Sequence, residues 1–248
     1  MNAFLRKGCG LALLFLFANN QTHAQVDLSK FEIGLTGGTF VYQGDLTPSP
    51  VGSYRTLRPA VNLFINRILS PSFSLRTSLF YGGLNGNDAA YKNPAWRQQR
   101  NFNFITHPLE LTEIIVWNAW STDTKITPYV FGGLGLTFLN IKRDYKNFNG
   151  EYFAAQGEDL FARLQEDIAH KTPKLLPVVP VGVGVQIALT KKLSLIGETS
   201  YRFTRTDYLD GFSKAANPQY YDHYQTHTIG VLYKLGKRSN LECPTIIR

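Results

Sequence analysis

The feature that most constrains the fold is a period-two pattern of side chains that recurs along the chain after residue 30. Apolar residues alternate with small or polar ones in eight stretches, at about 31–42, 58–68, 73–82, 102–118, 126–139, 180–189, 193–205 and 226–235. Because successive side chains of a β-strand point to opposite faces, this pattern predicts eight strands, each with one apolar and one polar face.

The connections between these stretches alternate strictly between long and short. The long ones, at 43–57, 83–101, 140–179 and 206–225, are separated by short ones at 69–72, 119–125 and 190–192. Outer-membrane barrels have tight periplasmic turns and longer extracellular loops, and an even strand number returns both termini to the periplasm. A soluble β-sandwich also has many short alternating strands, but it has no reason to gather its long loops at one end. We therefore predict an all-β fold: an eight-stranded antiparallel up-and-down transmembrane barrel in the outer membrane.

The first 24 residues have the form of a secretory signal. Arg6 and Lys7 precede a short apolar run at 11–18, and the small residue Ala24 ends the segment. The run is too short to cross a bilayer as a helix, and an uncleaved anchor is the alternative. Removal of Arg6 and Lys7 with the signal changes the formal charge from +8 to +6 and leaves Cys243, which predicts a free thiol or an intermolecular disulfide. The expected organisation is a signal (1–24), a barrel (25–236) and a basic periplasmic tail (237–248).

The polar faces of the strands carry charged residues that would point into the barrel. They are Glu32, Arg76, Glu110, Glu198, Arg202 and Lys234. An eight-stranded barrel is just wide enough inside for side chains, and buried charges there must be paired. We interpret the six as a structural ion-pair network; a proton or solute path is the alternative. Strict alternation places Glu113 on the lipid face, and we attribute this to a β-bulge that shifts the phase.

Two further patterns concern the strand ends and the longest connection. Residues 157–170 predict a short amphipathic helix, with Leu160, Phe161, Leu164 and Ile168 spaced for one face. Aromatic residues near the strand ends suit girdles at the two membrane interfaces: Tyr42, Phe73, Tyr81, Trp117, Trp120, Tyr129, Phe138, Tyr201 and Phe203.

No catalytic or metal-binding pattern stands out in the sequence. The histidines have no cysteine or carboxylate partner at metal-ligand spacing, and the pair His223 and His227 spans a loop–strand junction. The loop carboxylates Glu158, Asp159, Glu166 and Asp167 are expected to face solvent or to lie in the loop helix. We expect no cofactor. The positive charge could suggest a nucleic-acid partner, but the export signal and the barrel pattern favour lipopolysaccharide phosphate or a protein partner, so we expect no nucleic acid.

Short segments in a fixed order along almost the whole mature chain carry a family resemblance. They are FEIGL (31–35), YQGDL (42–46), RPAV (58–61), LRTSLFYG (75–82), GND (86–88), PLEL (108–111), TPYVFGGLG (127–135), PVGVG (180–184), YRFTRTDYLD (201–210) and CP (243–244). Together they resemble the PorG-like outer-membrane component of the type IX secretion system, a family also described as a domain of unknown function, DUF6089.

The resemblance implies a non-enzymatic barrel that acts as a structural or anchoring component of the type IX protein secretion machinery. Its implied partners are the periplasmic ring subunits of that machinery, a lipoprotein and its partner, together with outer-membrane lipids. The tail residues Lys237, Arg238 and Cys243 are the expected ring contacts. One alternative is a barrel that binds or transports a hydrophobic ligand. A lipid-acting enzyme is the last alternative, because it would need an exposed Ser/His set at a strand end.

Overall fold

Eight strands close into one antiparallel barrel in the computed structural model, which describes residues 27–120, 124–217, 219 and 221–236. Each strand pairs with its neighbours, and the first closes on the last. The strands are β1 (Phe31–Gln43), β2 (Arg58–Ile68), β3 (Phe73–Gly82), β6 (Leu109–Asn118), β7 (Ile126–Phe138), β9 (Leu175–Ala188), β10 (Leu193–Thr204) and β11 (His223–Lys234). The eight-stranded up-and-down barrel predicted from the sequence is confirmed.

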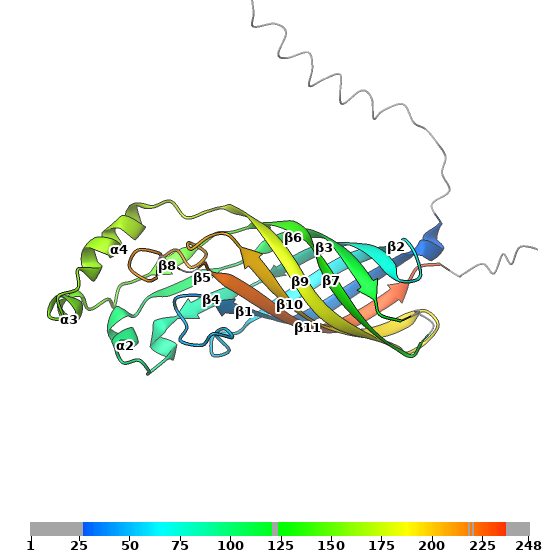
Figure 1. Cartoon of the computed structure of the whole chain (residues 1–248), viewed down its shortest axis with the longest axis horizontal. Helices are drawn as coiled ribbons and strands as arrows, with labels where there is room; N and C mark the ends of the chain where they lie inside the picture. The colour runs from blue at the N-terminus through cyan, green and yellow to red at the C-terminus, as the bar shows by residue number, and fades with distance from the viewer. Residues whose placement is uncertain (1–26, 121–123, 218, 220, 237–248) are drawn as a thin grey trace, which may run out of the picture.

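The long and short connections gather at opposite ends of the barrel (Figure 1). The three short connections and both described ends of the chain lie at one end, which we call the turn end. The four long connections lie at the other, which we call the loop end. A short 3-10 helix, η1 (Leu28–Lys30), precedes β1 at the turn end.

The outer surface of the barrel is a continuous band of apolar side chains. Exposed residues on it include Ile33, Leu35, Val61, Leu63, Ile65, Leu79, Leu111, Ile115, Val130, Leu134, Val183, Ile229 and Val231. A water-soluble protein rarely exposes such an extensive apolar surface. The band is the one expected of a barrel whose strands cross a membrane with apolar side chains outward.

The predicted strand at 102–118 is wrong in one respect, because the segment forms two strands in two sheets. β5 (Asn103–Thr106) pairs with β4 (Leu84–Asn87) and β8 (Lys142–Asp144) in a small sheet outside the barrel. Pro108, which lacks a backbone N–H donor, lies between β5 and β6. β9 begins at Leu175, five residues before the predicted start at 180, and Pro177 lies within it, paired with Leu136 of β7.

The expected bulge at Glu113 is also wrong. Glu113 pairs in regular register with Thr77 of β3 on one side and with Leu134 of β7 on the other. Its neighbours Leu111 and Ile115 share its outward face and are exposed. Glu113 therefore lies on the apolar outer surface of the barrel.

Two of the aromatic residues assigned to interfacial girdles lie inside the protein. Tyr42 and Tyr129 are buried, whereas Phe73, Tyr81, Trp117, Trp120, Phe138 and Phe203 are exposed. Position near a strand end does not decide the face, and both tyrosines share the parity of their inward neighbours. Each hydroxyl finds a buried partner inside, as described below.

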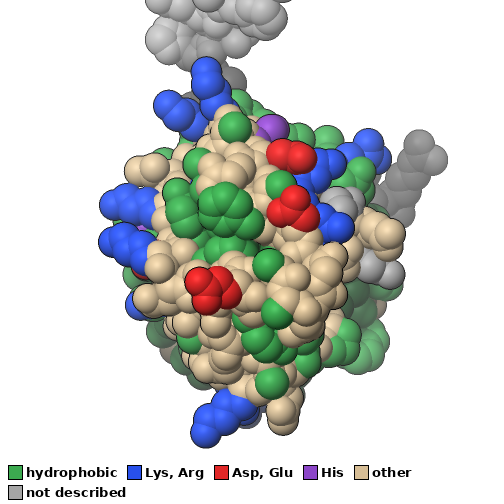
Figure 2. Space-filling model, turned by 90° about the vertical axis from the view of Figure 1, so that its left-hand side faces the viewer, with side chains coloured by type: hydrophobic (Ala, Val, Ile, Leu, Met, Phe, Trp, Pro, Cys, Tyr) green, Lys and Arg blue, Asp and Glu red, His purple; other side chains and the backbone are tan. Residues whose placement is uncertain are grey.

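The long connections 44–57, 83–108, 139–174 and 205–222 form a folded cap over the loop end. It contains the sheet β4–β5–β8 and the helices η2 (Asp88–Ala90), α2 (Trp96–Arg100), α3 (Gly150–Ala154) and α4 (Leu160–Ala169). A hydrophobic core runs from the barrel mouth into this cap: Phe40, Tyr42, Leu46, Leu84, Phe102, Phe104, Phe153, Leu164, Leu209 and Phe212. Viewed from outside, Lys and Arg side chains lie mostly around the rim of the cap, with hydrophobic patches nearer its middle (Figure 2).

The helix predicted at 157–170 is present as α4. The Asp159 carboxylate begins it by accepting the N–H of Ala162 at 3.0 Å. Leu160 and Leu164 are buried in the cap, as predicted, but the Phe161 side chain is 57% exposed. No helix in the described part of the chain is long and apolar enough to cross a membrane.

Candidate functional site

The six charged residues expected inside the barrel lie in its lumen. Arg76, Glu110, Glu198 and Arg202 are almost fully buried, Glu32 is buried nearer the turn end, and Lys234 is partly exposed. Lys234 Nζ is 3.9 Å from Glu32 Oε1 at the turn end. They form three ion pairs: Arg76–Glu198, Arg202–Glu110 and Lys234–Glu32.

The Arg76–Glu198 pair crosses the lumen, because β3 and β10 lie diametrically opposite in the strand order. The Tyr129 hydroxyl donates to the same carboxylate oxygen of Glu198 at 2.7 Å. Arg76 Nε donates to Asn66 Oδ1 at 2.9 Å, and Asn66 Nδ2 donates to Glu32 Oε2 at 3.1 Å. One chain of hydrogen bonds therefore runs from Glu32 across the lumen and joins opposite walls.

The Arg202–Glu110 pair closes the lumen nearer the loop end. Arg202 Nε lies 3.1 Å from Glu110 Oε2, and Arg202 Nη1 donates to the hydroxyls of Ser200 and Thr226 at 2.5 and 2.7 Å. The Tyr224 hydroxyl donates to Glu110 Oε2 at 2.6 Å. Because β11 and β6 are also diametrically opposite, this second cluster ties another pair of walls.

Large aromatic side chains fill the lumen around both guanidinium groups, and sequence reasoning missed them. The guanidinium carbons of Arg76 and Arg202 lie 4.1 and 4.7 Å from the ring centroids of Phe64 and Phe80, respectively. The alternation of inward and outward residues along each strand could have identified these aromatic side chains. Phe64, for example, stands two residues from Asn62, which the alternation already places inside.

These contacts indicate that the charged residues of the lumen hold the barrel walls together. Both partners of each buried pair have further hydrogen bonds, which is the condition under which buried charges are tolerated. At the turn end the lumen leaves a cavity of about 20 Å³, bordered by Asn66, Arg76 and Tyr129. That is room for about one water molecule.

The cap has its own buried ion-pair cluster, centred on Asp88. Its carboxylate oxygens lie 2.7 Å from Arg97 Nη1 and 2.6 Å from Arg100 Nε. Both arginines also donate to the backbone carbonyl of Asp45, at 3.0 and 2.9 Å. The cluster therefore fixes α2 and η2 against the segment that follows β1.

Asp167 of α4 organises the other half of the cap. Its carboxylate is fully buried and accepts the backbone N–H groups of Ser213, Lys214 and Ala215 at 3.2, 3.0 and 2.9 Å. These donors come from a connection far away in the sequence. Asp167 lies in the loop helix, one of the two expected positions, and the backbone groups that it binds could not be identified from local pattern.

A second carboxyl cluster surrounds the Tyr42 hydroxyl where the cap meets the barrel. That hydroxyl lies 2.7 Å from Asp210 Oδ2 and 2.9 Å from Asp222 Oδ1, and all three residues are buried. A phenol has one proton and cannot donate to both carboxylates. A second proton, on one of the two carboxyl groups, satisfies both contacts. Burial raises the pKa of both Asp210 and Asp222 well above the usual range; repulsion by Asp45 adds to the rise at both, and repulsion by Asp210 adds to the rise at Asp222.

A histidine on the outer wall joins a loop to the barrel. The Thr199 hydroxyl lies 2.7 Å from His227 Nδ1, and His227 Nε2 lies 2.9 Å from the Tyr54 hydroxyl. The Tyr54 ring also stacks on the imidazole. Sequence spacing gave no sign of this contact. These contacts anchor the loop 44–57 to the outer wall of the barrel.

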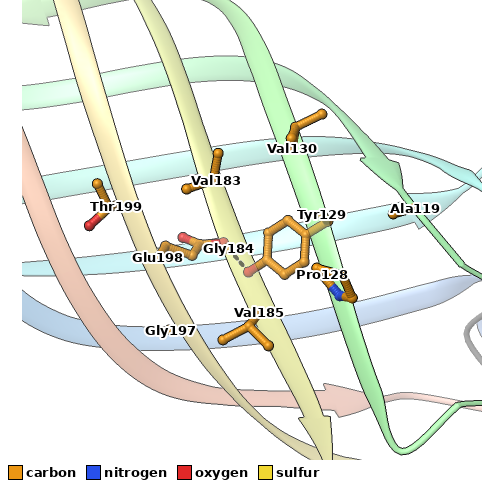
Figure 3. A pocket seen from close by; sticks show the side chains of 10 residues that line it. All are labelled: Ala119, Pro128, Tyr129, Val130, Val183, Gly184, Val185, Gly197, Glu198 and Thr199. Carbon is orange, nitrogen blue, oxygen red and sulfur yellow. Dashed lines mark hydrogen bonds between the residues drawn. The ribbon is translucent and has the colours of Figure 1, made fainter.

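A shallow hollow of about 540 Å³ lies in the outer wall where β7, β9 and β10 meet (Figure 3). Its lining includes Gly197, Pro128 and three valines, Val130, Val183 and Val185. The Tyr129 side chain, hydrogen-bonded to Glu198, lies behind Gly184 on the inner side of the wall. The hollow is apolar and open to the surroundings of the barrel.

A family comparison covers nearly the whole of this barrel and its cap. The family described as "Domain of unknown function (DUF6089)" matches residues 9–234. The chain belongs to the DUF6089 family. No curated protein sequence matches it. The fold assigned to this DUF6089 chain is that of an eight-stranded outer-membrane barrel, which rests on its own strand pairing and apolar exterior.

Solved outer-membrane barrels resemble the DUF6089 chain at low identity. Neisserial surface protein A is 14% identical, with 83% of this chain and 97% of that chain covered and a TM-score of 0.44. The attachment invasion locus protein Ail of Yersinia pestis is 10% identical, with 82% and 98% covered and a TM-score of 0.41. OprG of Pseudomonas aeruginosa is 8% identical, with 83% and 96% covered and a TM-score of 0.42. Similarities this low carry nothing about function.

Three of the residues singled out in the sequence have no structural counterpart here. Lys237, Arg238 and Cys243 lie outside the described residues of the DUF6089 chain, as does the expected signal at 1–24. Within the described residues, no group of three or more histidine, cysteine, aspartate or glutamate side chains is arranged to hold a metal ion.

The carboxyl groups of the cap predict a pH dependence of its stability. Burial raises the pKa of Asp45 to about 7 and that of Asp207 to about 6, both above their unfolded values. A folded state that binds protons more tightly than the unfolded state loses stability as the pH rises. The cap should therefore be most stable below about pH 4 and weaken steadily up to about pH 7. Limited proteolysis of the folded barrel at fixed steps between pH 5 and 8 measures this change.

A substitution separates this effect from a general response of the barrel to pH. Asp45→Asn should flatten the pH profile of cap proteolysis, because the amide does not titrate. Glu158→Gln, at an exposed position of the cap, should leave the profile unchanged. A cap that becomes more resistant to proteolysis as the pH rises would contradict the sign of the prediction.

Proposed function

We propose that this protein is a non-enzymatic outer-membrane barrel that anchors the type IX protein secretion machinery and contacts its periplasmic ring. The observation that carries the proposal is the filled lumen. Arg76–Glu198 and Arg202–Glu110 cross the barrel and occupy its interior, so we place the protein's work on its outer surfaces. The resemblance of its ordered segments to the PorG-like secretion component supplies the identity of the machinery.

The proposed orientation follows from the two ends of the barrel. The turn end, with short connections and both described ends of the chain, faces the periplasm, and the loop end with its cap faces the outside. Lipids of the outer membrane surround the apolar band. In this orientation the residues that follow β11 enter the periplasm, where a ring of soluble and lipid-anchored subunits can reach them.

The proposed ring contact combines the turn end with the basic tail 237–248. Lys237 and Arg238 supply positive charge to this segment, and Cys243 supplies a thiol. The proposed partners are the ring lipoprotein and its companion subunit. A basic segment favours an acidic surface on the partner, and such a contact should weaken as the ionic strength rises.

Co-purification from native outer membranes tests the proposal. Tagged full-length protein should retain the two ring subunits after mild detergent extraction, and deletion of residues 237–248 should reduce their yield. A variant with Lys237 and Arg238 changed to Gln keeps the length of the tail and tests the charge alone. Recovery of intact barrel without either ring subunit, from the full-length chain, would count against the proposal.

A non-reducing gel shows whether Cys243 links to a partner, and a single unshifted band would exclude that link.

The hollow in the outer wall favours a second candidate function, the binding of a hydrophobic ligand. Its apolar sides at Val130, Val183 and Val185 suit an acyl chain, and its volume of about 540 Å³ falls in the range of small-molecule sites. The hollow opens on the outer face of the barrel, and its lining also includes Tyr129 and Glu198 of the lumen network. A ligand that remained bound through purification and was displaced by Gly197→Leu would favour this alternative.

A further inference from the structure

Glu113 is an acidic side chain on the part of the barrel surface that faces the middle of the membrane. It is the fifth of the ten residues of β6, and its partner Thr77 is the fifth of the ten residues of β3. Glu113 is four residues from Leu109 at one end of β6 and five from Asn118 at the other, so with a rise of about 3.3 Å per residue it lies roughly 13 Å along the strand from the nearer end. It is therefore at the middle of its strand, away from both ends of the barrel.

Apart from Thr77, the outward-facing neighbours of Glu113 are apolar. Leu111 and Ile115 flank it on its own strand, Leu79 lies on β3 and Leu134 on β7, and all four are exposed. Leu134 is 69% exposed and is therefore among the most accessible side chains of the band. Within the described structure, the Thr77 hydroxyl is the one recorded partner of the carboxyl group and donates to Glu113 Oε2 at 2.8 Å.

An ionisable side chain in the membrane is costly, and such residues usually face a protein partner or a polar cavity. One hydroxyl satisfies one of the two carboxylate oxygens of Glu113. The other oxygen can accept a further hydrogen bond from outside the barrel. A leucine or valine would suit lipid better at this position, so the glutamate indicates that something other than lipid covers it.

A glycine beside Glu113 makes room for such a contact. Gly132 of β7 faces outward next to Ile115, and a Cβ placed there would meet no atom closer than 3.7 Å. Packing within the barrel therefore does not require a glycine at this position. Its absent side chain leaves a notch between Val130 and Leu134, in which the backbone of a neighbouring segment can approach the wall closely.

We propose that Glu113, Thr77 and Gly132 form a docking point for a membrane-embedded segment of another protein, which offers an arginine or lysine side chain to the carboxylate. Charge complementarity selects this occupant. A second copy of the chain, related by a two-fold axis through this point, would place one Glu113 carboxylate against the other and offer neither a basic side chain. This contact lies within the membrane and does not depend on the proposed periplasmic ring.

Site-specific photo-crosslinking in living cells tests the proposal. A photoreactive amino acid at Leu134, beside Glu113, should give a crosslinked protein product. The matched control position is Ile229 on β11, which is 62% exposed and lies diametrically opposite β6. Ile229 should give lipid adducts and no such product. Products limited to lipid at Leu134, or a product that contains a second copy of this chain, would overturn the proposal.

Two substitutions then connect the product to the carboxyl group. Glu113→Leu should reduce its yield about tenfold or more, because loss of one partner of a desolvated charge pair costs several kcal/mol. The leucine suits lipid, so the isolated variant should fold as well as the parent and keep its heat-modifiable migration on gels. Glu113→Arg should regain the product only when the arginine or lysine mapped on the partner is changed to glutamate. A product that survives Glu113→Leu, or one that maps to a segment without a basic residue, would refute the assignment.

Discussion

Replacing Glu198 by alanine should lower the free energy of unfolding of the barrel by about 3–5 kcal/mol, because it leaves a buried charge without its partner. The carboxylate of Glu198 accepts from Arg76 across the lumen and from the Tyr129 hydroxyl. After the substitution Arg76 keeps Asn66, but its charge is no longer balanced at that point of the lumen. Urea unfolding of the barrel in lipid vesicles, followed by tryptophan fluorescence, measures the loss.

A double substitution tests whether the loss comes from the unpaired charge. Arg76→Met together with Glu198→Leu removes both charges and should recover at least half of the stability lost in Glu198→Ala. Glu158→Ala, at an exposed position of the cap, serves as the control and should change the free energy of unfolding little. If Glu198→Ala costs less than about 1 kcal/mol, the typical value of an exposed pair, the lumen pairs do not hold the barrel walls together.

The second large effect is expected in the cap. Asp88→Asn keeps the size of the side chain but removes the charge that Arg97 and Arg100 share. Both guanidinium groups are buried, so the cap should become less stable by about 3–5 kcal/mol while the barrel strands stay folded. Hydrogen exchange should therefore become about a hundredfold faster or more in segments 44–57 and 83–108.

Two comparisons define the result expected for Asp88→Asn. The strands β9 and β10, distant from α2 in the fold, should keep their protection against exchange. Asp144→Asn, a change of an exposed aspartate in the same cap, should leave the exchange of both segments near that of the parent. If hydrogen exchange became equally faster in the strands and in the cap, the two would unfold as one unit. That result would contradict a separately stabilised cap.

The strands could be predicted from the sequence because a membrane barrel requires apolar and polar residues to alternate along each strand. β3, at 73–82, has the predicted bounds, and the parity that placed Arg76 and Glu198 inside agrees with their positions in the lumen. The same parity identifies Phe64 and Tyr129 as inward residues once aromatic side chains are allowed inside. Glu113 was assigned to the correct face by alternation, and the error lay in the bulge introduced to move it.

The structure of the cap could not be predicted from local sequence patterns, because contacts between residues far apart in the sequence determine it. Asp167 is bound by backbone N–H groups more than 40 residues away, and Tyr42 lies against carboxyl groups more than 160 residues away. Neither contact leaves a local period in the sequence. The alternation of β5 predicts that segment 102–108 belongs to a barrel strand. In the structure, β5 instead pairs with β4 and β8.

Secretion of type IX cargo by cells in which the gene is deleted tests most directly whether this filled barrel serves protein secretion from its surfaces. We expect cargo proteins to disappear from the medium and to return when the full-length chain is supplied again. Normal secretion of cargo by the deletion strain would contradict the proposed role.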